Sequence, residues 1–144
     1  TPVTMKSFEA RTRIAASPET IWAVLTDAPG FPEWEPNVER IEGTIAPGEK
    51  ITVHTSFSPD RAFPVKVAVF EPPRRMVWRG GMPFGLFVGE RTFTLTPQPD
   101  GTTEVHTREE FRGLLSPLIG RSIPDLTPTF EQFAAALKTR AEAS

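Results

Sequence analysis

The chain has 144 residues, a length typical of one domain, and we expect residues 1–144 to form a single unit. It contains no cysteine, which excludes disulfides, thiolate metal sites and cysteine nucleophiles and fits a cytoplasmic protein. With 16 basic and 18 acidic residues the net charge is −2, and the basic stripe that nucleic-acid binding needs is missing. Apolar runs are short, so we expect neither a membrane span nor a signal peptide.

The first elements predicted along the chain are a strand and two short helices. Apolar and polar residues alternate over residues 8–15, which is the pattern of a half-buried strand. Ser17 is a good N-cap and Pro18 suits the first helical position, so a helix is predicted to begin here and to end before Gly30. Residues 31–36 predict a second helical turn.

About six strands are predicted to follow in succession. The first of them is polar and suits an edge of the sheet, whereas the second has one apolar face. The third is expected to place Val65, Val67 and Val69 on the inner face of the sheet. The last two form a hairpin across a turn rich in proline and glycine. The predicted strands span residues 38–44, 50–57, 64–70, 76–80, 87–95 and 103–111.

Near the C-terminus the apolar period changes from that of a strand to that of a helix. Phe130, Phe133 and Leu137 recur at spacings that place them on one helical face. Pro124 interrupts the preceding segment, so we expect a regular helix from about Thr127. A run of strands with segregated helices is typical of an α+β domain, here a curved antiparallel sheet of six to seven strands around the long C-terminal helix.

This arrangement raises the question of a cavity. A twisted sheet curls, and a single helix cannot fill the whole concave face of six or seven strands. The inward side chains either fill one another's space, as apolar stripes usually do, or line a pocket for an apolar ligand. If a pocket exists, its predicted lining is Phe57, Val67, Met76, Trp78, Phe87, Arg91, Phe93, Thr107, Glu109, Phe111, Ile123, Leu126, Phe130 and Phe133.

Four segments carry a resemblance to a known family. Their sequences are SPETIW (17–22), FPEWEPNV (31–38), GERTFTL (89–95) and EEFRGLL (109–115). Together with the order of elements they resemble the polyketide cyclase/dehydrase branch of the START-like superfamily, also called SRPBCC, over nearly the whole chain. The resemblance implies the helix-grip fold, with a deep hydrophobic cavity between the C-terminal helix and the sheet. Its members bind lipids, sterols, aromatic polyketides or other apolar molecules, and some catalyse ring closure and dehydration.

Two charged residues fall on the apolar faces of the predicted hairpin. Arg91 shares its face with Leu95, and Glu109 shares its face with Val105. If the turn is centred near Asp100, Leu95 pairs with Val105 and Arg91 lies opposite Glu109. A buried charge is costly unless it is paired, so we predict a salt bridge between the two.

This predicted pair has two interpretations. It is either the polar end of a pocket or a structural pair near the sheet rim. In the first case the arginine would bind a carboxylate or stabilise an enolate, and the glutamate, its pKa raised by an apolar setting, would serve as an acid or base. Arg91 and Glu109 are therefore the candidate catalytic residues.

The remaining candidates are weaker. His54 and His106 fall on the outer face by alternation, and no spacing of ligands predicts a metal site. No phosphate or dinucleotide fingerprint is present, so no cofactor is expected. Residues 80–85, with Met82 and Phe84, predict either a lid over the pocket or a hairpin turn whose apolar tip packs down.

Three functions stay open at this point. The favoured one is the binding of a small hydrophobic molecule, lipid-like or aromatic, by a carrier or sensor. The second is a cyclase, aromatase or dehydratase that uses Arg91 and Glu109, although the absence of tyrosine and of an inward histidine argues against it. The third is a protein-interaction module whose interior is filled by side chains.

Overall fold

The alternating segments form one antiparallel sheet. The computed structural model describes residues 4–56, 62–113, 115–119 and 123–144, and within these ranges the sheet has seven strands in the order β1-β7-β6-β5-β4-β3-β2. Their bounds are β1 Thr4–Ile14, β2 Val38–Glu42, β3 Lys50–Thr55, β4 Ala62–Glu71, β5 Arg75–Met82, β6 Phe87–Pro97 and β7 Thr103–Arg112. The predicted polar strand β2 does lie at an edge of the sheet, and β1 forms the other edge.

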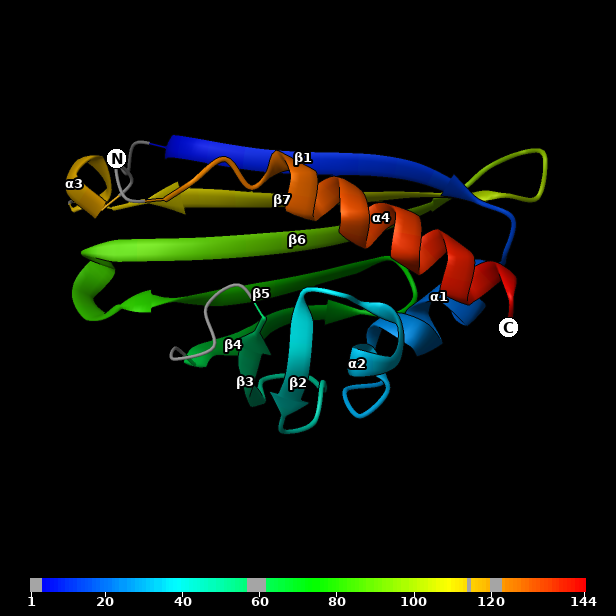
Figure 1. Cartoon of the computed structure of the whole chain (residues 1–144), viewed down its shortest axis with the longest axis horizontal. Helices are drawn as coiled ribbons and strands as arrows, with labels where there is room; N and C mark the ends of the chain where they lie inside the picture. Colours follow the sequence, from blue (N-terminus) through cyan, green and yellow to red (C-terminus); the bar gives the residue numbers. More distant parts are fainter. Residues whose placement is uncertain (1–3, 57–61, 114, 120–122) are drawn as a thin grey trace.

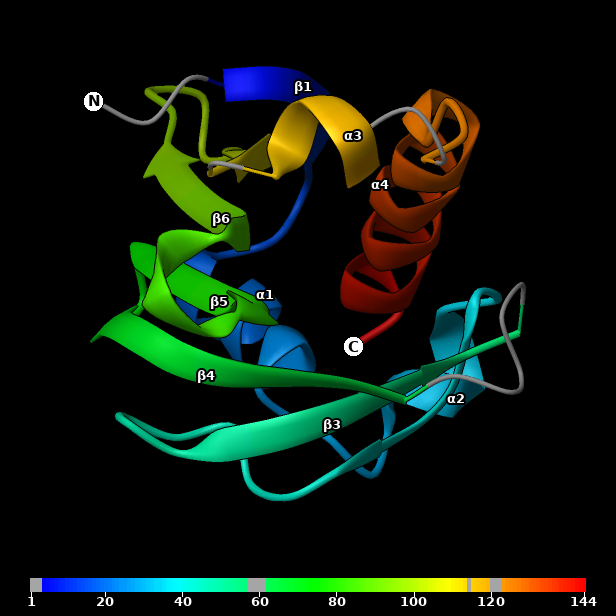
Figure 2. The ribbon, with the colours of Figure 1, turned by 90° about the vertical axis from the view of Figure 1, so that its left-hand side faces the viewer.

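The helices lie on the concave side of the sheet and at its two ends. α4 crosses the front of the sheet, α1 and α2 lie at one end, and α3 lies at the other (Figure 1). Seen along the strands, the sheet wraps around the interior, with α4 and α2 on its open side (Figure 2). The bounds are α1 Pro18–Leu25, α2 Phe31–Trp34, α3 Ser116–Ile119 and α4 Thr127–Glu142, with a single 3-10 turn at Pro83–Gly85. The predicted α+β helix-grip fold is therefore confirmed.

The core lies between the sheet and the helices. Alternation places one side chain in two on the concave face, where it meets the apolar stripe of α4 and the inner faces of α1 and α2. Phe93 and Met76 from the sheet and Leu137 from α4 are completely shielded from solvent. These residues belong to one continuous apolar cluster with Ile21 and Leu25 of α1, so the short helices are held by burial as well as by their own hydrogen bonds.

The last turn of α4 is fastened to the end of edge strand β1. The Lys138 ammonium donates to the Arg13 carbonyl at 2.9 Å, and the Glu142 carboxylate accepts from the Ala15 backbone N–H at 2.8 Å. Lys138 and Glu142 also pair with each other at 2.7 Å. Side chains of α4 thus bond to backbone groups at the end of the edge strand, in Arg13 and in Ala15 just beyond it.

Two details of the strands differ from the prediction. Val65 and Val67 face inward as expected, but the pairing of β4 with β5 shifts between Val67 and Val69. Phe70, and not Val69, then packs on the core and lies edge-on to Trp22 at 5.3 Å. The irregularity inserts one residue into β4, and because side chains alternate with a period of two, one extra residue exchanges the faces.

The glycine-rich segment is the second difference. Residues 80–82 continue strand β5 and pair with β6, so the predicted loop is shortened to the 3-10 turn at Pro83–Gly85. Phe84 has a left-handed backbone conformation, with φ of 60°, and its side chain is 96% exposed. The prediction that the tip packs down is wrong for Phe84, and the lid interpretation stays a prediction.

Ser17 caps the N-terminus of α1. The Ser17 side chain accepts a hydrogen bond from the Thr20 backbone N–H at 3.2 Å, as the sequence predicted. Replacing Ser17 by alanine is expected to lower the free energy of unfolding by about 1 kcal/mol, because that N–H loses its partner. Urea unfolding measures the change. The control Ser7→Ala, on the exposed face of β1, is expected to stay within about 0.5 kcal/mol, and an equal effect of both variants would contradict the capping role.

Candidate functional site

The candidate site is built around Arg91, on the inner face of β6. The pairing of the strands places Arg91 directly opposite Trp78 of β5 on one side and opposite Glu109 of β7 on the other. The hairpin has the predicted register, since Leu95 is paired with Val105. Three neighbouring strands therefore deliver an arginine, an indole and a carboxylate to one region of the concave face.

The guanidinium of Arg91 is enclosed by aromatic rings. Its Cζ lies 4.9 Å from the centre of the Phe93 ring and 4.5 Å from the centres of both Phe130 and Phe133 on α4. Arg91 Nε donates to the Thr107 hydroxyl at 3.1 Å, whereas Nη2 is shielded from solvent and has no hydrogen-bond partner. Burial lowers the pKa of Arg91, while the negative charges of Glu109 and Glu35 act in the opposite direction.

The predicted salt bridge between Arg91 and Glu109 is not formed. Within the described ranges no ion pair joins the two side chains, although their backbones are directly paired. Arg91 extends toward the rings of α4, whereas Glu109 Oε2 lies only 3.6 Å from where a Cβ on Gly89 would be. A Cβ at position 89 would therefore be in van der Waals contact with the carboxylate. Burial raises the pKa of Glu109, and the charge of Arg91 partly offsets this rise.

A third charged residue, Glu35, belongs to the same region and was not predicted. It follows α2 directly, is only 4% exposed, and accepts the Asn37 backbone N–H at 2.9 Å. Burial raises the pKa of Glu35, while the bond from Asn37 and the charge of Arg91 act against the rise. Residues 35–37 have no regular secondary structure, so neither a helical nor a strand period could indicate which way this side chain points.

Two further polar atoms of the interior have no partner. Trp78 is 6% exposed, and its Nε1 is buried without a hydrogen bond. The hydroxyl oxygen of Thr55 on β3 is also buried without a hydrogen-bond partner. Buried polar groups in native proteins are generally bonded, so these atoms are unusual features of the interior.

The residues of the predicted lining differ in their burial. Phe87 and Phe111 are half-buried and stack at 5.7 Å, toward the end of the sheet remote from α1. Ile123 and Leu126, before α4, are also half-buried, and the Ile123 carbonyl accepts from Lys6 at 2.6 Å. Phe57 lies outside the described residues. The buried group, which faces the core, comprises Val67, Met76, Trp78, Phe93, Thr107, Phe130 and Phe133.

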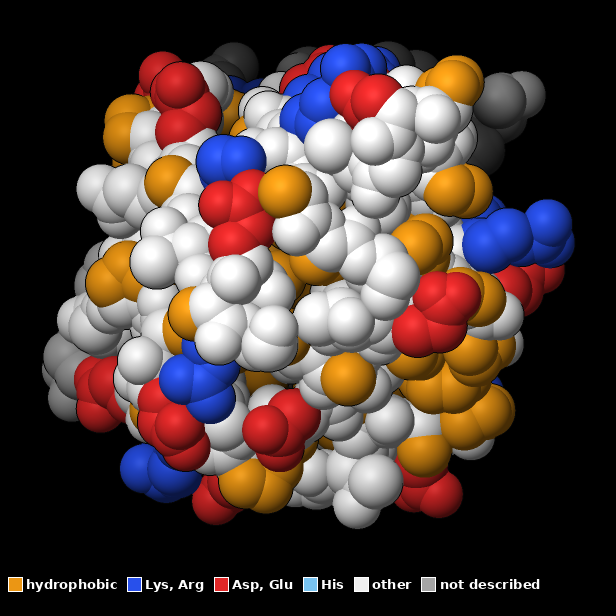
Figure 3. Space-filling model, turned by 90° about the vertical axis from the view of Figure 1, so that its right-hand side faces the viewer, with side chains coloured by type: hydrophobic (Ala, Val, Ile, Leu, Met, Phe, Trp, Pro, Cys, Tyr) orange, Lys and Arg blue, Asp and Glu red, His pale blue; other side chains and the backbone are white. Residues whose placement is uncertain are grey.

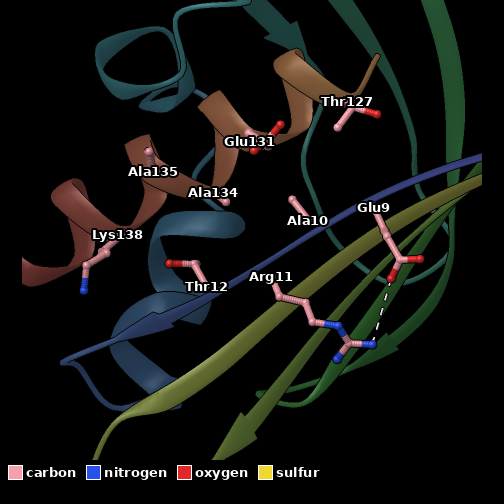
Figure 4. A pocket seen from close by; sticks show the side chains of 9 residues that line it. All are labelled: Glu9, Ala10, Arg11, Thr12, Thr127, Glu131, Ala134, Ala135 and Lys138. Atoms are coloured by element: carbon pink, nitrogen blue, oxygen red, sulfur yellow. Dashed lines mark ion pairs between the residues drawn. The ribbon is translucent and has the colours of Figure 1, made fainter. Parts of the chain in front are cut away.

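A groove on the outside of the molecule is distinct from this interior site. It runs between edge strand β1 and the outward side of α4, is open to solvent, and has a volume of about 460 Å³ (Figure 4). Charged and small side chains line it, including Glu9, Arg11, Glu131 and Lys138. None of the residues predicted to contact a ligand contributes to this groove.

The histidines belong to the surface. His54 contacts Glu42 at 3.0 Å and His106 contacts Glu9 at 2.8 Å, both on the outer face of the sheet. Among the described residues no group of histidine and acidic side chains could hold a metal ion, and no helix is long and apolar enough to cross a membrane. The face shown in Figure 3 carries acidic and basic side chains interspersed, without a patch of one sign.

The comparisons with known proteins agree with this architecture. Residues 5–142 match the model of a family described as polyketide cyclase / dehydrase and lipid transport. A START superfamily protein from Mycobacterium smegmatis has 17% sequence identity, with 95% of this chain and 97% of that chain covered and a TM-score of 0.69. The Zhui aromatase/cyclase from Streptomyces sp. R1128 has 14% identity, with 95% and 93% covered and a TM-score of 0.70.

A third solved structure, truncated norcoclaurine synthase from Thalictrum flavum, has 17% identity, with 97% of this chain and 94% of that chain covered and a TM-score of 0.71. At such identities the likeness shows the fold alone. No curated protein matches the sequence.

Proposed function

Because the chain belongs to the polyketide cyclase/dehydrase and lipid transport family, we propose that it binds a small, largely apolar molecule between the sheet and α4. Arg91 and Trp78 form the polar end of the site, and the rings of Phe93, Phe130 and Phe133 contact the apolar body of the ligand. Fold alone does not choose a function, so the proposal rests on the chemistry of this region.

The observation that carries the proposal is the pair of unused donors on neighbouring strands. Arg91 Nη2 and Trp78 Nε1 are both shielded from water, and neither has an acceptor in the protein. A buried donor without a partner costs about 1–3 kcal/mol, a cost that a ligand oxygen would remove. The guanidinium and the indole are set among apolar rings, which suits a ligand with an apolar skeleton and a single polar end.

One observation also favours the enzymatic alternative. Glu109 has no hydrogen-bond partner among the described residues, and burial raises its pKa, the direction that favours a role as general acid. An aromatase, cyclase or dehydratase would use Glu109 to move a proton while Arg91 stabilised an enolate oxygen. Binding comes first in either case, so the same experiment tests both.

We expect a thermal-shift screen of fatty acids, sterols, flavonoids and polyketide-like aromatics to yield a chemically coherent set of ligands. A ligand at about 100 times its dissociation constant adds about 2.7 kcal/mol to the stability. Trp78→Phe keeps most of the ring and removes the donor, and it is expected to weaken binding by about 2- to 13-fold, which corresponds to one hydrogen bond. Titration calorimetry measures the change.

The matched control is Trp22→Phe, in α1, where the ring packs on Phe70. This variant is expected to bind the same ligands with unchanged affinity. If no compound in the panel shifts the melting temperature, the proposed function is wrong. Such a result would favour a protein-interaction module whose interior is filled by side chains.

A further inference from the structure

We propose that the inward-facing carboxylates of Glu35 and Glu109 make the Arg91 site select a neutral ligand oxygen, such as that of an aromatic ketone, against an anionic carboxylate. This inference rests on the proposed function, because it concerns the same site and names the class of ligand. It also separates this site from the arginine sites that bind carboxylates, in which the guanidinium is free to serve as the counter-ion.

Acidic side chains outnumber basic ones around Arg91. Arg91 contributes one positive charge. Glu109 lies opposite it in the strand pairing, and the buried Glu35 directly follows Trp34, whose ring packs against the same Phe133 ring that contacts the guanidinium. When both carboxyl groups are ionised, the site has a net charge of −1 before any ligand enters. A ligand carboxylate would add a third negative charge beside a single positive one. Like charges repel strongly where water is excluded, so the anion meets a barrier that a ketone does not.

The hydrogen bonding of the site is incomplete. Both unused groups, Arg91 Nη2 and Trp78 Nε1, are donors. A carbonyl oxygen has two lone pairs and no charge, so it can accept from such donors without disturbing the balance between Arg91 and the acids. Trp78 is more than nine-tenths buried, which makes its missing bond an internal feature of the site and not a solvent-facing one.

Glu35 is fixed in place. The Asn37 amide, two residues away, donates to Gln132 on α4 at 3.0 Å, and Glu33 pairs with Arg140 on α4 at 3.0 Å. Trp34 packs against Phe133 at 5.6 Å. The segment that carries Glu35 is therefore attached to α4 on both sides, and its carboxylate is held in the interior by the Asn37 N–H.

The test uses two probes of nearly equal shape, 2-acetylnaphthalene and 2-naphthoate, titrated into the full chain at pH 7.5. The wild-type protein is expected to bind the ketone at least tenfold more tightly than the carboxylate. Glu35→Gln and Glu109→Gln each remove one negative charge with little change of shape, and each is expected to reduce this ratio by about tenfold. The control Glu39→Gln, an exposed glutamate of β2 four residues from Glu35, is expected to leave the ratio as it is.

The outcomes separate the inference from the proposed function. If the wild-type protein binds naphthoate as tightly as the ketone, or if neither glutamine variant changes the ratio, the inference is overturned while an interior binding site stands. If neither probe binds to the wild-type protein or to any variant, the proposed function falls and the inference falls with it. Circular dichroism of each variant confirms that it is folded, and the two variants are independent, so one that fails to fold leaves the other as the test.

Discussion

Replacing Phe93 by alanine is expected to lower the free energy of unfolding by about 3–5 kcal/mol. Phe93 is completely buried. Its ring centre lies 4.9 Å from that of Trp78 and 5.9 Å from that of Phe133. The Arg91 guanidinium also stacks against this ring. The substitution removes apolar contacts on three sides and leaves a cavity that the surrounding strands cannot fill.

Chemical denaturation measures this loss, and Phe84→Ala is the matched control. Phe84 is almost fully exposed, so the same chemical change is expected to stay within about 0.5 kcal/mol there. A loss below about 1 kcal/mol for Phe93→Ala would mean that the region relaxes around the missing ring, and that the packing around Arg91 is looser than the structure indicates.

Replacing Arg91 by methionine is expected to cost about 3 kcal/mol at pH 7.5 and clearly less near pH 4.5. Removing one partner of a buried group of charges leaves the others uncompensated, and the contacts of the guanidinium with three aromatic rings are lost as well. Methionine keeps much of the apolar length of the side chain, so the loss reports mainly on charge and hydrogen bonding.

The pH dependence follows from the pKa shifts of the two acids. Burial raises the pKa of Glu35 and Glu109 above their usual value of 4.5, and the charge of Arg91 holds both pKa values down. An acid whose pKa is raised on folding favours the folded state below its unfolded pKa, and this contribution is lost as the pH rises through the folded pKa. Without Arg91 the pKa values rise further, so the variant loses more stability than the wild type between pH 4.5 and pH 7.5.

Urea unfolding of both proteins at the two pH values measures this difference. Arg11→Met serves as the control, because Arg11 is 60% exposed and its ion pairs are solvated, so its effect is expected to be small at both pH values. If Arg91→Met cost the same at pH 4.5 as at pH 7.5, the electrostatic link between Arg91 and the two acids would be refuted.

Much of the fold could be predicted from local patterns. The period of two predicts which residues of β6 and β7 face inward, and the turn near Asp100 predicts their register, so the sequence alone places Arg91 opposite Glu109, as the structure does. The N-cap at Ser17 and the start of α4 at Thr127 also followed from residue chemistry. These predictions depend on neighbours in the chain or directly across a hairpin.

The parts that could not be predicted depend on contacts between distant segments. The bulge in β4 turns Phe70 inward in place of Val69. It arises from the pairing with β5, and the alternation of apolar and polar residues in the sequence does not indicate it. Glu35 is buried in an irregular segment whose neighbouring residues, Trp34 and Asn37, contact the distant helix α4. The predicted salt bridge failed for a similar reason, since Phe130 and Phe133 of α4 compete with Glu109 for the guanidinium.

The fastening of α4 to β1 also bears on how the protein avoids self-association. An unpaired strand edge is a template on which the strand of another molecule can add, and β1 is a long edge strand. The Lys138 ammonium already occupies the Arg13 carbonyl, and the Glu142 carboxylate occupies the N–H of Ala15. An incoming strand would have to displace both charged groups, so the C-terminal part of α4 also protects this end of the sheet against aggregation.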